Sequence, residues 1–557
     1  AANGTAVGRS ALAANTTGAN NTGIGRSALL SNTTGYDNVA IGTYALDANT
    51  EGDSNTTIGH NSLSSNTTGI NNTAVGRSCL NANTTANNNS ALGRGALAVN
   101  TTGTQNTAIG SRALSNNTTA NNNTSIGDVS LFTNTTGTNN TAIGQGALYA
   151  NTTASNNTAI GKNALVANTT GEHNTGIGQS SLTLLTTGDQ NAAVGSFSLQ
   201  ATTTGEYNVA MGYNTLGANT TASYNTGLGH RALQANTTGA ENTAVGGEAL
   251  DANTTGAANT AVGVGALGSN TTASNNTAMG RSCLLNNTTG HSNTCYGRLC
   301  ASSNTSGVRH TAMGYFALYS NTSGVENTAI GNTALQYMTT GNSNTGVGHE
   351  ALQNATTGNG NVCLGQATMR STTTAADCTA VGNAAGLDNT TGSNNLFLGH
   401  DAGRSNSPSG SNTTGSDSIC LGNNDINDLF CADTTISSSD ARDKTDVTNF
   451  TIGLDWIKAC RPVTYRWDRR TWYGTDAEPY GTPDGSKKRN RIHIGFLAQE
   501  MLAIEKTHGY GNSKDDSIIV TNNMDEMSYG IKYERLVPIL VNAIKELETR
   551  LAAVEAA

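Results

Sequence analysis

The sequence predicts an all-β repeat solenoid, a β-roll of 17-residue coils, followed by a small α+β domain that ends in a coiled-coil helix. Two observations predict the solenoid. A glycine returns every 17 residues from Gly8 to Gly399 without a slip, and a large apolar residue stands before each one. Leucine recurs four residues after the glycine, from Leu12 to Leu352 with a break at Ala301. A register this strict predicts one structural unit for each repeat.

Each repeat follows the consensus N-T-A-I-G-x-x-A-L-x-x-N-T-T-G-x-x. Seventeen residues are too few for a helical hairpin and suit two strands of four or five residues joined by two turns. The glycine supplies one bend and Asn-Thr-Thr-Gly the other, since Gly and Asn tolerate positive φ. One coil buries about two large side chains, so it is stable only in a stack with ladders of Ile, Leu, Asn and Thr. We expect the Leu and Ile/Val columns to be buried within or between chains.

The chain divides into three parts. Residues 1–402 are the predicted β-roll shaft. Residues 403–438 are an irregular transition, in which the repeat glycine returns as Gly422 after a six-residue insertion around Pro408. Residues 439–557 are a separate domain, because the periodicity stops and all three tryptophans lie there.

Composition argues against several classes of function. The net charge is -9 with no long run of like charge, which argues against nucleic-acid binding. The one basic cluster, residues 487–491, is interpreted as a solvated loop. No stretch approaches the roughly 20 apolar residues of a membrane span, so no membrane insertion is expected. The shaft has no paired carboxylates in a recognisable pocket, so no enzyme that turns over a substrate is expected.

The sequence predicts neither a cofactor nor a metal site. Calcium-binding rolls need a repeating Asp, which these coils lack. No C-x-x-C occurs, and His60, His230, His349 and His400 are coils apart. The Asn-Thr-Thr triplets are formal glycosylation sequons, interpreted here as turn and ladder residues.

Six cysteines stand where the repeat normally has alanine, and they are interpreted as small buried residues. They are Cys79, Cys283 and Cys300 at one position of the coil, and Cys295, Cys363 and Cys420 at another. Cys283 and Cys300 occupy the same position in adjacent coils, close enough for a disulfide bond if the geometry allows. The sequence does not decide whether they form one.

Two resemblances follow from these motifs. The repeat resembles the three-chain, left-handed β-roll heads of trimeric bacterial adhesins and the shaft segments of phage fibres. Residues 439–444, Ser-Asp-Ala-Arg-Asp-Lys, match S-D-x-R-x-K, the signature of the S74 peptidase family of intramolecular chaperones behind endosialidase tailspikes and phage fibres. Further similar segments follow in order, at residues 454–457, 461–467, 495–500 and 533–536.

The resemblance to the S74 family implies self-cleavage between Ser438 and Ser439. Ser439 would attack the carbonyl of Ser438, with Lys444 as the base that takes its proton. Arg442 would lower the pKa of the lysine by charge repulsion or bind the oxyanion, and Asp440 completes the signature. The alternative is that Ser439 begins a strand, with Arg442 and Lys444 on a solvated face.

The C-terminal helix, predicted from about residue 533 to 555, carries Leu540, Ile544, Leu547, Leu551 and Val554 at alternating steps of four and three. This spacing is the seam of a coiled coil. The alternative is a helix packed on its own domain. The resemblance favours a trimer, which would fix the register of three repetitive chains before the shaft assembles.

The leading hypothesis is a structural homotrimeric fibre, a viral tail fibre or spike shaft on the virion surface. It would attach to a receptor on the host surface, with a glycan as one candidate. Its C-terminal domain would direct trimerisation and cleave itself once, without turnover of another substrate. The alternative is a cell-surface adhesin or extracellular filament built from the same roll and chaperone.

Overall fold

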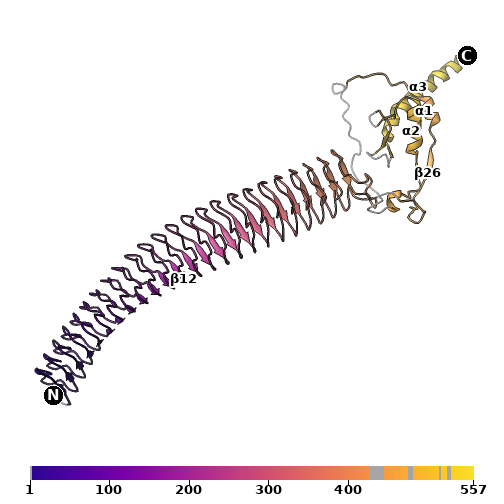
Figure 1. The fold of residues 1–557 in the computed structure, drawn as a ribbon. Coiled ribbons are helices and arrows are strands. Elements are labelled where there is room, and N and C mark those ends of the chain that lie inside the picture. Colours follow the sequence, from indigo (N-terminus) through magenta and orange to yellow (C-terminus); the bar gives the residue numbers. More distant parts are fainter. Residues whose placement is uncertain (1–2, 427–444, 474–480, 514–515, 523–528) are drawn as a thin grey trace. The chain divides into compact units, whose positions relative to one another are not determined.

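The computed structural model of the 557-residue chain describes residues 3–426, 445–473, 481–513, 516–522 and 529–557 (Figure 1). It divides into two compact units, Ala1–Asn359 and Gly360–Ala557. The first unit is a β-solenoid with one short strand in each 17-residue coil. The second unit holds further coils and a small domain of helices and β-hairpins. This confirms the predicted solenoid of 17-residue coils followed by a small domain with a C-terminal helix.

The strands of the first unit are three residues long and recur at the period of the sequence. They are β1 (Thr5–Val7), β2 (Thr22–Ile24), β3 (Val39–Ile41), β4 (Thr56–Ile58), β5 (Thr73–Val75), β6 (Ser90–Leu92), β7 (Thr107–Ile109), β8 (Thr124–Ile126), β9 (Thr141–Ile143), β10 (Thr158–Ile160), β11 (Thr175–Ile177), β12 (Ala192–Val194), β13 (Val209–Met211), β14 (Thr226–Leu228), β15 (Thr243–Val245), β16 (Thr260–Val262), β17 (Thr277–Met279), β18 (Thr294–Tyr296), β19 (Thr311–Met313), β20 (Thr328–Ile330) and β21 (Thr345–Val347).

From β1 to β20, each strand pairs in parallel with the strand one coil later, and equivalent residues face each other. Thr5 faces Thr22, and Val7 faces Ile24. The same register repeats between β9 and β10, where Ile143 faces Ile160. Every coil therefore places identical sequence positions in columns, as the repeat predicts.

The prediction of two strands in each coil is wrong, because the structure has one. The Ala-Leu stretch after the glycine, for which a second strand was expected, is a turn in which leucine has positive φ, as in Leu29 (φ 53) and Leu46 (φ 53). Its backbone still bonds to the next coil, since Leu29 N donates to Ala45 O over 3.1 Å. Positive φ in a bulky residue costs free energy, and complete burial of Leu29 offsets that cost.

The repeat glycine has the conformation that the sequence predicts. Gly25 has φ +130, and a Cβ atom there would lie 2.6 Å from Gly42 O in the next coil. The glycine of Asn-Thr-Thr-Gly differs from the prediction, because Gly35 does not have positive φ. Its backbone instead lies against the next coil, where a Cβ would be 2.4 Å from Gly52 O. Positive φ falls two residues later, at Asp37 (φ 55).

The interior of each coil holds the leucine and small residues. The leucine column is fully buried from Leu29 to Leu352, and so is the middle residue of most strands, such as Ala40. The Ile/Val column before the repeat glycine is different. In β1–β21 this residue is exposed or half-buried in every strand. A single chain therefore buries one large column and leaves the second on its surface.

Asparagines form two buried ladders along the stack. In the first, Asn49 donates from Nδ2 to Oδ1 of Asn32 over 2.7 Å and to Gly52 O over 2.9 Å. In the second, Asn38 N donates to Oδ1 of Asn21 over 3.0 Å. Asn32 and Asn66, in the same ladder, belong to Asn-Thr-Thr sequons, but their side chains are fully buried. They act as ladder residues, which matches the interpretation from the sequence.

The second unit opens with the strands β22 (Val362–Leu364), β23 (Thr379–Val381), β24 (Leu396–Leu398) and β25 (Ile419–Leu421). β24 and β25 stay in register across the six-residue insertion, since Leu396 faces Ile419. Phe397 fills the place where most coils have alanine. Its ring packs against Gly386 and Gly403, which stand where earlier coils have leucine. The large and small residues have exchanged places, and the interior stays filled.

The remaining elements form the small domain. They are α1 (Leu454–Ala459), β26 (Val463–Tyr465), η2 (Arg470–Tyr473), β27 (His493–Gly495), α2 (Ala498–Thr507), β28 (Val520–Asn522), β29 (Tyr529–Ile531), η3 (Tyr533–Arg535) and α3 (Leu536–Glu555). β26 pairs with β27 and β28 with β29, both antiparallel. The core of the domain consists of Trp456, Met501, Ile519, Val520, Leu536 and Ile539.

Candidate functional site

The predicted self-cleavage site lies outside the described residues. Ser438, Ser439, Asp440, Arg442 and Lys444 all belong to residues 427–444. The serine–lysine dyad therefore stays a prediction. The structure does describe the four later segments that were singled out in the sequence, and it shows how they assemble.

Three of these segments contribute to one core. Residues 454–457 lie on α1, where Trp456 is fully buried. Residues 495–500 lead from β27 into α2, and Met501 immediately after them is buried against the same cluster. Residues 533–536 comprise η3 and the first residue of α3, Leu536, which joins the cluster. α1 packs directly against α3.

The segment at residues 461–467 is tied to the others by polar contacts. Arg461 forms an ion pair with Glu500 through both ends of its guanidinium group. The hydroxyl oxygen of Tyr533 accepts a hydrogen bond from Phe496 N over 3.1 Å. Gly495 leaves room for that hydroxyl, because a Cβ there would lie 2.4 Å from it. The segments thus hold one another in place.

A buried carboxylate, Glu505 on α2, orders the start of β28. Its oxygens accept hydrogen bonds from Ser517 Oγ over 2.7 Å, from Val520 N over 2.8 Å and from Ile519 N. Glu505 is fully buried. Sequence reasoning did not single out this residue. The available signal was a carboxylate on the face of α2 that also carries the buried Met501.

The first half of α3 is fastened to the domain by its polar side chains. Asn542 Nδ2 donates to Phe450 O over 2.7 Å and to Ile452 O over 3.2 Å. Glu546 accepts a hydrogen bond from Leu454 N over 3.3 Å. These contacts place the helix on its own domain while leaving its apolar seam free of it.

Residues 439–510 match the family model described as the chaperone of endosialidase, peptidase S74. The C-terminal segment carries a chaperone-of-endosialidase domain. The match begins at the predicted cleavage serine and includes three of the four later segments. No curated protein matches the chain.

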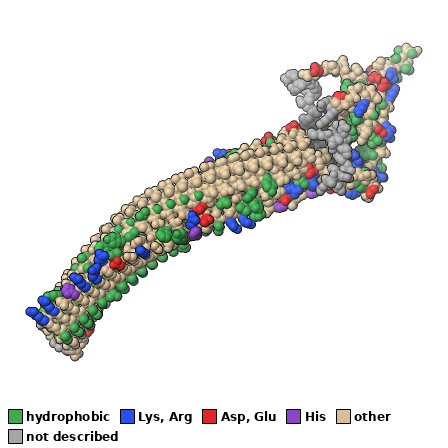
Figure 2. All heavy atoms as spheres, in the orientation of Figure 1, with side chains coloured by type: hydrophobic (Ala, Val, Ile, Leu, Met, Phe, Trp, Pro, Cys, Tyr) green, Lys and Arg blue, Asp and Glu red, His purple; other side chains and the backbone are tan. Residues whose placement is uncertain are grey.

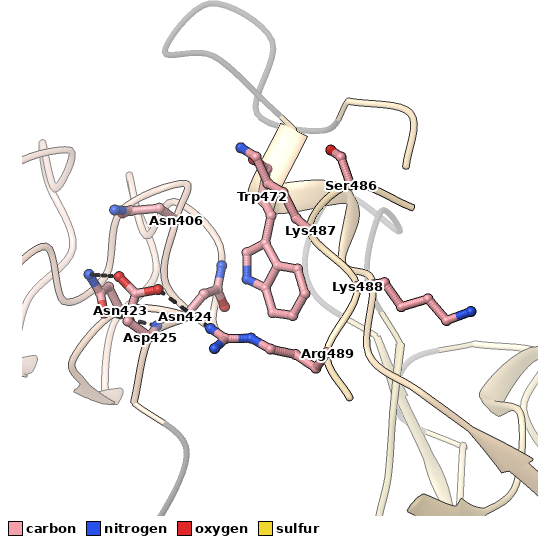
Figure 3. Close-up of a pocket in the computed structure, with 9 residues that line it drawn as sticks. All are labelled: Asn406, Asn423, Asn424, Asp425, Trp472, Ser486, Lys487, Lys488 and Arg489. Atoms are coloured by element: carbon pink, nitrogen blue, oxygen red, sulfur yellow. Dashed lines mark hydrogen bonds and ion pairs between the residues drawn. The ribbon is translucent and has the colours of Figure 1, made fainter. Parts of the chain in front are cut away.

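The chaperone domain lines a pocket of about 560 Å³ within the second unit (Figure 3). Its residues are Asn406, Asn423, Asn424, Asp425, Trp472, Ser486, Lys487, Lys488 and Arg489. Arg489 lies over the ring of Trp472 at 5.0 Å and within 3.8 Å of an Asp425 oxygen. Arg469 Nη1 donates to Asn424 Oδ1 over 2.9 Å.

The basic loop of residues 487–491 is exposed, as interpreted from the sequence, but it also has defined contacts. Lys487 Nζ donates to Trp472 O, and its ammonium group lies 5.2 Å from the ring of Tyr473. Lys487 thus contacts the domain itself, whereas Arg489 of the same loop reaches Asp425, which follows β25 in the last coil. This is a contact surface that the sequence did not predict.

The C-terminal seam of the chaperone domain is exposed. Leu540, Ile544, Leu547, Leu551 and Val554 are all at least two-fifths exposed, and Ile544 is 64% exposed. The buried residues of α3 are instead Leu536, Ile539 and Ala543. The helix thus has two apolar faces, of which only one is covered by its own domain. No helix in the described part of the chain is long and apolar enough to cross a membrane.

Proposed function

We propose that the chain forms a homotrimeric fibre, the shaft of a viral tail fibre or spike that attaches to a host surface. The chaperone domain directs trimerisation and then cleaves itself off between Ser438 and Ser439. The observation that carries this proposal is an exposed apolar column along the solenoid, with one large side chain in each coil.

The exposed residues form a continuous row along successive coils and are not scattered singly over the surface. Its members include Leu92 at 49% exposure, Met211 at 51% and Met313 at 43%. Each lies beside its equivalent in the next coil, because the strands are in register. Figure 2 shows hydrophobic side chains gathered in bands on the face in view. Contiguous exposed apolar surface is typical of a surface that binds another protein.

A threefold arrangement of chains would cover this column without any other partner. The outward face of each strand carries the apolar residue and, two positions earlier, usually a threonine. Three chains packed around one axis would cover all three columns at once and leave the polar turns outside. The exposed seam of α3 supports the same assembly, since leucine and isoleucine at heptad spacing pack between helices.

The chaperone domain supplies what the shaft lacks, a unique register. Identical coils allow three chains to pair with shifts of 17 residues, because the side chains match equally well after each shift. A trimer of the α3 helices fixes the three C-terminal ends first. The contacts of Arg469 and Arg489 with residues 424 and 425 then hold the last coil beside the chaperone while the shaft assembles from that end.

The test is the mass of the assembled protein. Multi-angle light scattering should give three times the chain mass of 56.8 kDa before cleavage. Replacing Ile544 and Leu551 by lysine should yield monomers or misregistered aggregates, while Thr549→Lys, off the seam, should leave the trimer intact. A monomer of the unchanged chain at micromolar concentration would refute the trimer. Mass spectrometry of purified particles would test the viral location.

A further inference from the structure

Three cysteine side chains meet inside the solenoid of the first unit. Cys283 lies in one coil, and Cys295 and Cys300 lie in the next. Their sulfur atoms are all within 4.8 Å of one another, and all three residues are fully buried. The sequence places Cys283 and Cys300 in one column but gives no sign that Cys295 joins them.

Other coils explain why the third sulfur is there. Cys295 is the middle residue of β18, and Cys300 follows the repeat glycine by three. The same two positions in an earlier coil hold Ser125 and Ser130, whose hydroxyl oxygens lie 2.6 Å apart. These two positions therefore face each other across the interior of every coil. Cysteine at both, with a third in the preceding coil, creates a triangle of sulfurs.

We propose that Cys283, Cys295 and Cys300 form an internal three-sulfur site for a soft monovalent metal ion of the Cu(I) class. Sulfur ligands select soft ions. The centre of a triangle whose sides are at most 4.8 Å lies no more than about 2.8 Å from each sulfur, and zinc–thiolate bonds, taken here as a guide, are about 2.3 Å long. Each sulfur would move inward by at most about 0.5 Å. Zn²⁺ fits less well, because it needs a fourth ligand and the group contains three sulfurs alone.

The experiment uses the full chain expressed in copper-supplemented medium and purified anaerobically under reducing conditions. Metal analysis should find about one copper per chain. X-ray absorption should show sulfur ligands alone. The matched variants are Cys295→Ala and Cys300→Ala, because alanine is the usual residue at both positions. Each should lose most of the copper without loss of folding. Cys79→Ala, which replaces a buried cysteine outside the cluster, should keep it.

Two results would overturn the proposal. One is equal copper in the unchanged chain and in Cys300→Ala, which would place the ion elsewhere. The other is a correctly folded, fully reduced chain that contains no copper after expression in its presence. Alkylation and peptide mapping on the same samples establish the reduced state, so that a Cys295–Cys300 disulfide is recognised and counts against the metal site.

Discussion

The side-chain amide of Asn151 donates from Nδ2 to Oδ1 of Asn134, its equivalent one coil earlier, over 2.8 Å. Asn134 in turn donates to Asn117 Oδ1 and to Gly137 O. Asn134→Ala should leave Asn117 Oδ1 without the hydrogen bond from Asn134, whereas Asn151 Nδ2 still donates to Ala154 O and Gly137 O still accepts from Asn123 Nδ2. Loss of a buried partner costs about 1–3 kcal/mol. We expect faster amide hydrogen exchange in the neighbouring coils. Asn139→Ala, at an exposed position of the same coil, is the control, since Ala258 occupies that position elsewhere.

A charge in the leucine column should disrupt the stack. Leu148 is fully buried, whereas Gln145 in the same coil is exposed. Leu148→Asp should therefore open its own and adjacent coils, because an unpaired buried charge costs several kcal/mol, and Gln145→Asp should be tolerated. Limited proteolysis would show the difference. Equal sensitivity of the two variants would mean that the inner and outer positions are misassigned.

Gly144 and Gly247 test which positions of a coil require glycine and which merely contain it. Gly144 has φ +132, and a Cβ there would lie 2.5 Å from Gly161 O, whereas nothing lies within 4 Å of a Cβ at Gly247. Gly144→Ala should destabilise its coil by about 2 kcal/mol. Gly247→Ala should be neutral or slightly stabilising. Hydrogen exchange across both coils measures the contrast, and similar effects would contradict it.

One coil should be sensitive to acid. His310 replaces asparagine in the second ladder, is 1% exposed and accepts a hydrogen bond from Asn327 N over 3.3 Å. Burial lowers its pKa from 6.5 to about 4. Its contribution to stability is complete above pH 6.5 and is lost as the pH falls towards 4, a change of roughly 3 kcal/mol. Hydrogen exchange in these coils should accelerate over that range. His310→Asn, which restores the usual residue, should abolish the acceleration.

Self-cleavage should release a C-terminal fragment that begins at Ser439 and contains 119 residues, counted from 439 to 557. Ser439→Ala and Lys444→Ala should both leave the chain intact while the trimer still assembles, because without the hydroxyl or its proton acceptor no nucleophile forms. Gel electrophoresis and N-terminal sequencing provide the readout. An unchanged chain that stays whole through assembly and long storage would limit the domain to a retained trimerisation cap.

The columns of the shaft were predictable, because a strict period fixes which residues share a position in successive coils. Whether a column faces the interior or the surface was harder to predict. Leucine and isoleucine are equally apolar, but Leu148 lies inside and Ile143 lies half-buried on the strand's outer side. The difference arises from the positive φ of Leu148, which turns a predicted strand into a turn. Sequence propensity gives no warning of it, since leucine rarely adopts that conformation.

The segments of the chaperone domain could be recognised from motifs that follow one another in the expected order. The contacts that their residues make could not be predicted. Trp456 marks a core residue by its size, whereas nothing in the sequence links Glu505 to the backbone of residues 519 and 520. The cysteine triangle escaped prediction for a related reason. Residues five apart face each other only because the coil has a turn where strands were expected.

The in-register stack has a genetic consequence. Most coils contact their neighbours through equivalent backbone and asparagine hydrogen bonds, so the gain or loss of 17 codons, or any multiple, keeps the register of these bonds and changes the length of the shaft by about 4.8 Å for each coil. Recombination between such similar sequences can produce these changes in single events. The length of the solenoid can therefore change in steps of one coil while the fold of the remaining coils is kept.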